Sequence, residues 1–155
     1  MSAADSAATS GCGICGLIAR VRAHTFPDFI AELDQHYVIL GDAQFYRGYC
    51  VLLYKHHATE LHELAPEPGR AAFDEVLQVA GAIAAVVRPI RLNYENLGNQ
   101  EPHLHWHIFP RSDSDEMRLA PVWLRPEAER KLILEDRERL DLIAALRAQL
   151  ARRRS

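Results

Sequence analysis

The stretch His103-Leu104-His105-Trp106-His107-Ile108-Phe109 alternates histidines with apolar residues. This period of two is typical of a β-strand with one buried face, because successive side chains of a strand point to opposite sides. The three imidazoles are therefore predicted on one face, and the apolar side chains on the face that packs into a core. Such a row serves either as a metal site or as a site for nucleophilic and proton-transfer chemistry. Surface histidines that share a face by chance are the remaining alternative.

The residues around this stretch favour a phosphate site. Residues 92–95 read as a short strand, and a loop rich in Asn, Gln and Gly follows over residues 96–102. Together with the histidine strand they predict a hairpin-like unit. The loop places amide side chains and backbone N–H groups beside the imidazoles, and such neutral donors suit phosphate oxygens. A site that only binds metal would not need these amides.

The motif resembles the signature of the histidine triad (HIT) family of nucleotide hydrolases and transferases, in which His and hydrophobic residues alternate in this order. Residues from about Cys12 to Arg111 follow the family's order of elements, and the Gly98-Asn99-Gln100 loop accompanies the motif. The resemblance implies a purine nucleotide substrate that contains AMP. It also implies a covalent nucleotidyl-histidine intermediate and a homodimer.

The same resemblance assigns roles to the three histidines. The middle one, His105, is the expected nucleophile, and the backbone carbonyl of His103 is expected to hold its second ring nitrogen. His107 is expected to contact the phosphate and to assist protonation of the leaving group. Tyr49 stands where many relatives carry a fourth histidine. This departure leaves the leaving-group preference open.

Further residues match the family's nucleotide-binding positions. Amides at Asn93, Asn99 and Gln100 are expected to reach the phosphate, although Asn and Gly are also common in turns. Asp42 aligns with the residue that holds the ribose hydroxyls, with a simple turn residue as the equal alternative. The apolar walls of the base pocket are expected from Ile14, Ile18 and Leu40. Without the resemblance these three would be read as core.

Cys12 and Cys15 form a Cys-x-x-Cys pair. A redox pair belongs at a helix N-terminus, whereas a β-prone run is expected after Cys15, so structural zinc is favoured over redox chemistry. Some branches of the HIT family complete such a site with positions that correspond here to His57 and His103, with His56 as a neighbouring candidate. A reduced pair without metal is the alternative. The third cysteine, Cys50, is expected to be a buried core thiol.

Composition sets limits on the function. The chain has 155 residues, 48% of them hydrophobic, which fits one compact domain. Its formal net charge of −3 argues against nucleic-acid binding, and the basic run Arg152-Arg153-Arg154 suits a solvated helix end. No apolar run approaches membrane-spanning length, and residues 1–10 lack the pattern of a secretory signal. We therefore expect a cytoplasmic protein with reduced cysteines and no membrane partner.

The predicted fold is an α+β domain with a five-stranded antiparallel sheet. Strands are expected at residues 16–21, 37–40, 48–54 and 92–95 and at the histidine stretch. Helical spacing of apolar residues predicts a short helix over 26–33 and a long one over 69–87, ended by Pro89. A last helix is expected over 126–153, with an apolar face formed by Leu132, Leu140, Ile143, Leu146 and Leu150.

Three segments follow from this pattern: a disordered tail at 1–10, the HIT domain at 11–112, and an extension at 113–155 whose helix packs on the domain or on a partner. The favoured activity is hydrolysis at the α-phosphate of a nucleoside phosphoramidate or dinucleoside polyphosphate, with release of AMP. A nucleotidyltransferase, a nucleotide-binding regulatory module and a zinc-binding protein are the alternatives. Because Arg111 is the one cation close to the motif, small neutral leaving groups such as amines are expected to react better than polyphosphate chains.

Overall fold

The computed structural model describes residues 11–153. The tail predicted at residues 1–10 lies outside the described residues. A single antiparallel sheet forms the centre of the molecule, in the strand order β1-β2-β3-β5-β4. This arrangement confirms the predicted α+β class. The strands are β1 (Phe29–Glu32), β2 (His36–Leu40), β3 (Cys50–Tyr54), β4 (Arg91–Glu95) and β5 (His105–Arg111).

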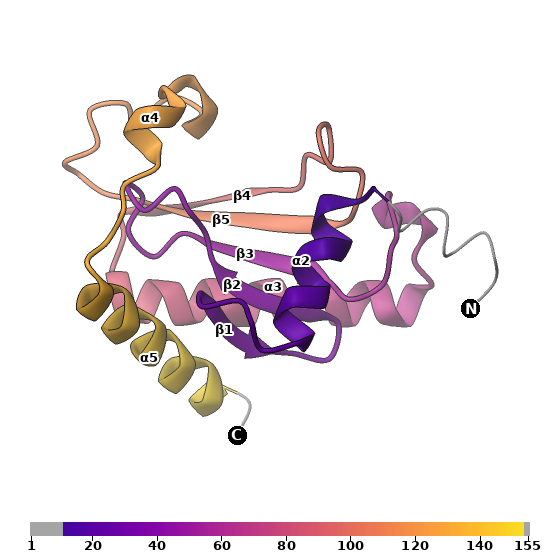
Figure 1. Cartoon of the computed structure of the whole chain (residues 1–155). Coiled ribbons are helices and arrows are strands. Elements are labelled where there is room, and N and C mark those ends of the chain that lie inside the picture. The colour runs from indigo at the N-terminus through magenta and orange to yellow at the C-terminus, as the bar shows by residue number, and fades with distance from the viewer. Residues whose placement is uncertain (1–10, 154–155) are drawn as a thin grey trace.

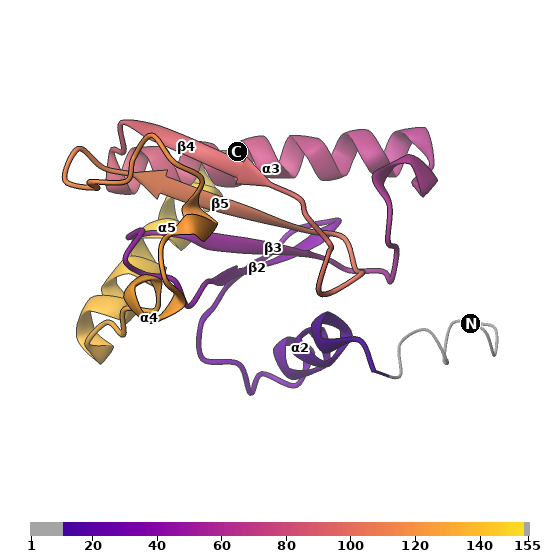
Figure 2. The same ribbon diagram turned by 90° about the horizontal axis from the view of Figure 1, so that it is seen from above.

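Helices cover both faces of this sheet. Figure 2 shows α3 on one side and α2 on the other, and Figure 1 shows α5 beside β1. None of the helices within residues 11–153 is long and apolar enough to cross a membrane. The α-helices are α2 (Gly13–Arg22), α3 (Pro66–Val87), α4 (Glu127–Arg130) and α5 (Asp136–Arg153), and short 3₁₀ helices span Leu61–Glu63 and Val122–Leu124.

Strand β5, which lies between β3 and β4, separates two cores. Its Trp106 and Ile108 point into the core beneath α3 and α5, where they pair across the sheet with Leu52 and Cys50 of β3. Its Phe109 points to the other core, beneath α2. His105 and His107 share the face of Phe109 because strand side chains alternate. The alternation in the sequence thus correctly predicted which side of β5 carries these two histidines.

Two elements near the N-terminus exchange the types predicted for them. Residues 16–21, expected as a strand, belong to helix α2, and its Ile14, Ile18 and Val21 form one buried stripe at helical spacing. Residues 26–33, expected as a helix, instead contain β1, which pairs with β2 and has an irregular register between Phe29 and Ala31. Both runs are short and apolar, so their local pattern fits either a helix or a strand. For residues 26–33, pairing with β2 favours the strand although the apolar residues have helical spacing.

The helix predicted over 126–153 is two helices. The first turn, α4, ends at Arg130, and α5 starts at Asp136. Leu132 lies in the linker and Leu140 on the outer side of α5, both more than half exposed. The other predicted residues of the apolar face, Ile143, Leu146 and Leu150, are buried against α3 in the same chain.

This packing predicts unequal effects for two leucines of α5. Leu146 is fully buried, so Leu146→Ala should lower the free energy of unfolding by about 2–5 kcal/mol, through lost burial and a cavity. The matched control Leu140→Ala, at a residue with 55% exposure, should change it by less than about 1 kcal/mol. Urea unfolding of both variants measures the difference, and equal effects would contradict the docking of α5 on its own domain.

Candidate active site

His105 is held in one tautomer at the start of β5. Its Nδ1–H donates to the backbone carbonyl of His103 at 2.6 Å, as expected from the sequence. A carbonyl can only accept, so in the neutral ring the lone pair lies on Nε2. The Asn96 amide donates to the carbonyl of His105 at 2.7 Å and ties the loop to the strand. The ring lines a cavity, and a neutral imidazole in this tautomer can act as a nucleophile through Nε2.

His107 contacts the hydroxyl of Tyr49, with 2.6 Å between Oη and Nδ1. Burial, and then the neighbouring His105, lower the pKa of His107 to about 4. Burial also raises the pKa of Tyr49, so its hydroxyl stays protonated. The hydroxyl can therefore donate to Nδ1 of a neutral imidazole, which leaves Nε2–H of His107 as a hydrogen-bond donor.

An aromatic layer fixes the position of Tyr49. Its ring stacks on Phe109 with 4.0 Å between centroids and an angle of 6° between planes. Gly41 approaches one edge of the Tyr49 ring so closely that a Cβ at position 41 would overlap it. A glycine is thus required at position 41 for the hydroxyl to reach His107.

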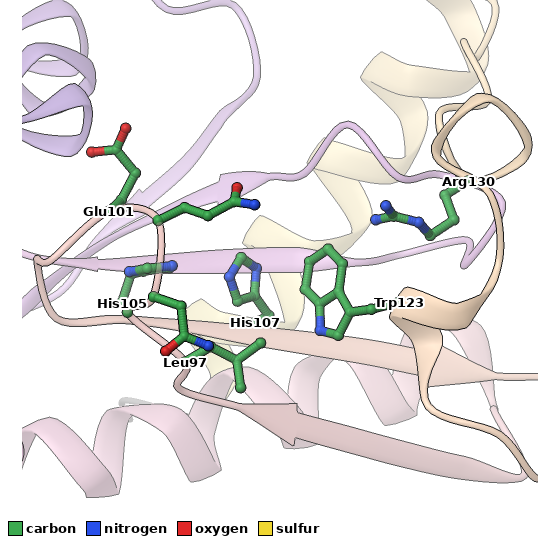
Figure 3. A pocket seen from close by; sticks show the side chains of 9 residues that line it. Leu97, Glu101, His105, His107, Trp123 and Arg130 are labelled. Carbon is green, nitrogen blue, oxygen red and sulfur yellow. The ribbon is translucent and has the colours of Figure 1, made fainter.

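The two histidines line an open cavity of about 460 Å³ (Figure 3). The loop after β4 forms one end of it, with Leu97 and Glu101 on the same side as His105. Trp123 and Arg130 lie at the other end. The remaining lining residues include Gly98, Asn99 and Gln100. The structure thus brings two of the three predicted phosphate amides, Asn99 and Gln100, to the two histidines.

The third predicted amide, Asn93, does not line this cavity. Its side-chain oxygen accepts from Arg111 at 2.9 Å. Arg111 itself is buried and binds the Asp115 carboxylate and two backbone carbonyls. The premise that Arg111 is the cation beside the motif is therefore wrong: this guanidinium anchors the segment after β5.

Sequence analysis missed Trp123 and Arg130. The Trp123 ring meets His107 edge to face at 5.4 Å between centroids, and the Arg130 guanidinium lies 4.7 Å above the Trp123 ring. Both belong to the segment after the motif, where no periodic pattern marks them. The available signal was an aromatic residue and separate arginines within a Pro-containing, irregular segment.

The residues expected around the ribose and the base lie in different parts of the structure. Asp42 is exposed and forms an ion pair with Lys131 at 3.2 Å. Ile14 and Ile18 lie on the buried face of α2, on the same side of the sheet as the two histidines. Leu40 belongs to the opposite core with α3 and α5, so it does not join them.

Four side chains converge at the N-terminus of α2: Cys12, Cys15, His57 and His103. Their ligand atoms all lie within 4.8 Å of one another. His103 Nδ1 is 3.4 Å from the Cys12 sulfur and 3.5 Å from that of Cys15, and His57 Nδ1 is 3.5 Å from the Cys15 sulfur. Tetrahedral zinc with ordinary bond lengths separates sulfur and nitrogen ligands by about 3.6 Å. The donor set therefore fits zinc, and His56 is not part of it.

The surroundings of the cysteine pair differ from the prediction in one respect. A helix, not a strand, follows Cys15, and the Cys12 sulfur caps it by accepting from the Cys15 N–H at 3.3 Å. Burial and the adjacent Cys12 raise the pKa of Cys15 to about 11. The argument from strand propensity was therefore wrong, and the interpretation as a metal site rests on the distances within the donor set.

Comparison with known proteins agrees with this geometry. A sequence model described as the HIT domain matches residues 25–114, more than half of the chain. The chain belongs to the HIT family. Comparison with curated proteins gave no match.

Solved HIT structures share the fold. A histidine triad protein from Bradyrhizobium japonicum has a TM-score of 0.70 at 24% identity, over 85% of this chain and 95% of its own. A zinc-bound histidine triad family protein from Mycobacterium smegmatis has a TM-score of 0.63 at 22% identity, over 93% and 96%. A HIT family member from Bacillus subtilis has a TM-score of 0.60 at 26% identity, over 92% and 96%.

The environment of His107 predicts an unusual titration. An unfolded histidine binds its proton near pH 6.5, but His107 in this HIT protein should do so only near pH 4. Between these values the unfolded chain binds more protons, so the free energy of unfolding should fall as the pH falls through this window. Imidazole ¹⁵N NMR gives the midpoint directly. In His107→Asn the pH dependence of stability should become shallower, and a midpoint near 6.5 in the wild-type protein would contradict the prediction.

Proposed function

We propose that this HIT protein hydrolyses nucleotides at the α-phosphate through a covalent nucleotidyl-His105 intermediate and releases AMP. The observation that carries the proposal is the hydrogen bond from His105 Nδ1 to the His103 carbonyl. It sets the lone pair on Nε2 of a ring that lines the cavity. A neutral imidazole in this tautomer can attack phosphorus and divide one difficult displacement into two easier ones.

In the first step the Nε2 lone pair forms a bond to the α-phosphorus, and the bond to the leaving group breaks with its electron pair on the leaving atom. The His103 carbonyl stabilises the positive charge that His105 then carries. In the second step water attacks the phosphorus, the P–N bond breaks, and AMP and neutral His105 are released. The water gives one proton to solvent, and the leaving group takes one up.

The other cavity residues orient the phosphate. Asn99 and Gln100 bring amide donors to its oxygens, without a charge that would hold the product tightly. His107 acts as a neutral donor through Nε2–H, because its low pKa leaves it uncharged at neutral pH. This role is narrower than the general-acid role expected from the sequence.

His105→Ala should reduce hydrolysis of adenosine 5′-phosphoramidate by at least about 10³-fold and leave AMP binding within about threefold, because it removes a bond made only during reaction. Mass spectrometry of quenched wild-type enzyme should detect the adenylylated chain, with the label on His105. The control His62→Ala changes an exposed histidine of the 3₁₀ helix Leu61–Glu63 and should retain full activity. Near-wild-type turnover in His105→Ala would overturn the proposal.

We also propose that the cluster of Cys12, Cys15, His57 and His103 binds one structural zinc ion. The interatomic distances of this donor set support it. His103 Nε2–H donates to the Tyr54 carbonyl at 2.8 Å, which leaves Nδ1 available as the ligand atom. The ion would neutralise the two thiolates and join α2 to the loop that leads into β5.

Protein purified without added metal should contain about one zinc per chain by elemental analysis. Cys12→Ser should lose most of it and unfold at lower temperature, because a closed tetrahedral site contributes directly to folding. Cys50→Ala is the matched control, since Cys50 is buried in the core on the other side of the sheet and should retain the metal. If the wild-type protein contained no zinc, the proposal would be refuted, and Cys12 and Cys15 would be ordinary thiols.

A homodimer is part of the proposal. The outer edge of β4 pairs with no strand within residues 11–153. On the α3 side the exposed Phe73 lies near Trp106, Leu77 follows one turn later on α3 and is also exposed, and Tyr94 of β4 is 47% exposed. A second copy that covers this edge and these side chains would remove both an open sheet edge and an apolar surface from water.

A further inference from the structure

Arg130 is the one cation among the residues that line the catalytic cavity. The other charged lining residue, Glu101, lies at the far end and accepts from the Gly13 N–H at 3.0 Å. The two histidines and the amides of Asn99 and Gln100 carry no formal charge when the imidazoles are neutral. Any anion longer than one phosphate would therefore meet its positive partner at Arg130.

Neighbouring cations are already paired with acids. Arg125 binds Asp115 and Glu129, and Lys131 binds Asp42 and Glu127. Arg130 differs from both. Its Nε–H donates to the Arg125 carbonyl at 2.9 Å, but its two terminal nitrogens form no hydrogen bond with residues 11–153. The planar end of the guanidinium remains available for an oxyanion.

Trp123 holds Arg130 in this position. The guanidinium lies over the indole, and the indole N–H donates to the Glu95 carboxylate on β4. The same indole contacts His107, so a single aromatic ring separates the charge from the catalytic histidines. The ring also limits the positions that the arginine can adopt, which reduces the entropy lost when it binds an anion.

Resting on the hydrolase activity proposed above, we propose that Arg130, stacked on Trp123, binds the phosphates of an anionic leaving group and makes dinucleoside polyphosphates the preferred substrate class. When His105 Nε2 attacks the α-phosphorus, the bridging P–O bond breaks and its electron pair stays on the oxygen of the departing nucleoside polyphosphate. Arg130 stabilises the charge that grows there. An uncharged amine offers it no such partner, so the preference is opposite to the one expected when Arg111 was taken as the nearby cation.

The test compares kcat/KM for diadenosine tetraphosphate and adenosine 5′-phosphoramidate in wild type, Arg130→Gln and Arg130→Lys. Arg130→Gln should lower the value for the tetraphosphate by about 10- to 100-fold, the range expected for loss of a charge-assisted hydrogen bond, and that for the phosphoramidate by less than about threefold. Arg130→Lys should fall between, since it keeps the charge but not the planar stack. Arg137→Gln, at an exposed arginine of α5 outside the cavity, is the matched control and should match wild type.

Two results would overturn the inference while leaving the hydrolase proposal intact: an equal loss on both substrates in Arg130→Gln, or no loss on either. Absence of hydrolysis of both substrates by the wild-type protein would instead refute the proposed function. Thermal unfolding of each variant separates a local effect from a folding defect. Trp123→Phe gives a second variant, and it should weaken the tetraphosphate reaction less than Arg130→Gln if the ring only supports the arginine.

Discussion

The site depends on the pairing of β5 with β3 on one side and with β4 on the other. This register places His105 opposite Leu53 and His107 opposite Val51, so both imidazoles lie on the α2 side of the sheet. A shift of one residue would turn them into the core beneath α3 and bring Trp106 and Ile108 to the cavity. Burial of those two side chains thus fixes the orientation of the histidines, and the folding of the hydrophobic core also assembles the site.

His103 connects three parts of the molecule. Its Nδ1 faces the two cysteine sulfurs, its Nε2–H donates to Tyr54, and its carbonyl accepts from His105. The cysteine cluster and His105 are therefore joined through one residue. A disturbance at the N-terminus of α2 would reach His105 through the backbone of His103, without contact between the cluster and a substrate.

Sequence reasoning succeeded where one period extends over several residues and one face is buried. The alternation over residues 105–109 and the helical stripe of α3 both predicted the observed elements, whereas His103, expected on the same face as the other two histidines, precedes β5 and joins the cysteine cluster. It failed at residues 16–21 and 26–33, where runs of a few apolar residues fit either period and the pairing of β1 with β2 decides. Trp123 and Arg130 line the cavity because the chain folds back over the sheet after β5. Local sequence patterns do not predict that path. The grouping of His57 with the cysteine pair came from family resemblance, because Cys15 and His57 are 42 positions apart and no local pattern connects them.

The chain has two tryptophans, and the fold assigns them to opposite faces of the sheet. Trp106 packs near Phe73 on the α3 side, whereas Trp123 forms a wall of the cavity between an imidazole and a guanidinium. The protein thus carries one intrinsic fluorophore in the cavity wall and a second one on the opposite face of β5. A ligand that enters the cavity would contact Trp123 and not Trp106, so a change in tryptophan emission on binding would come from the site, without any added dye.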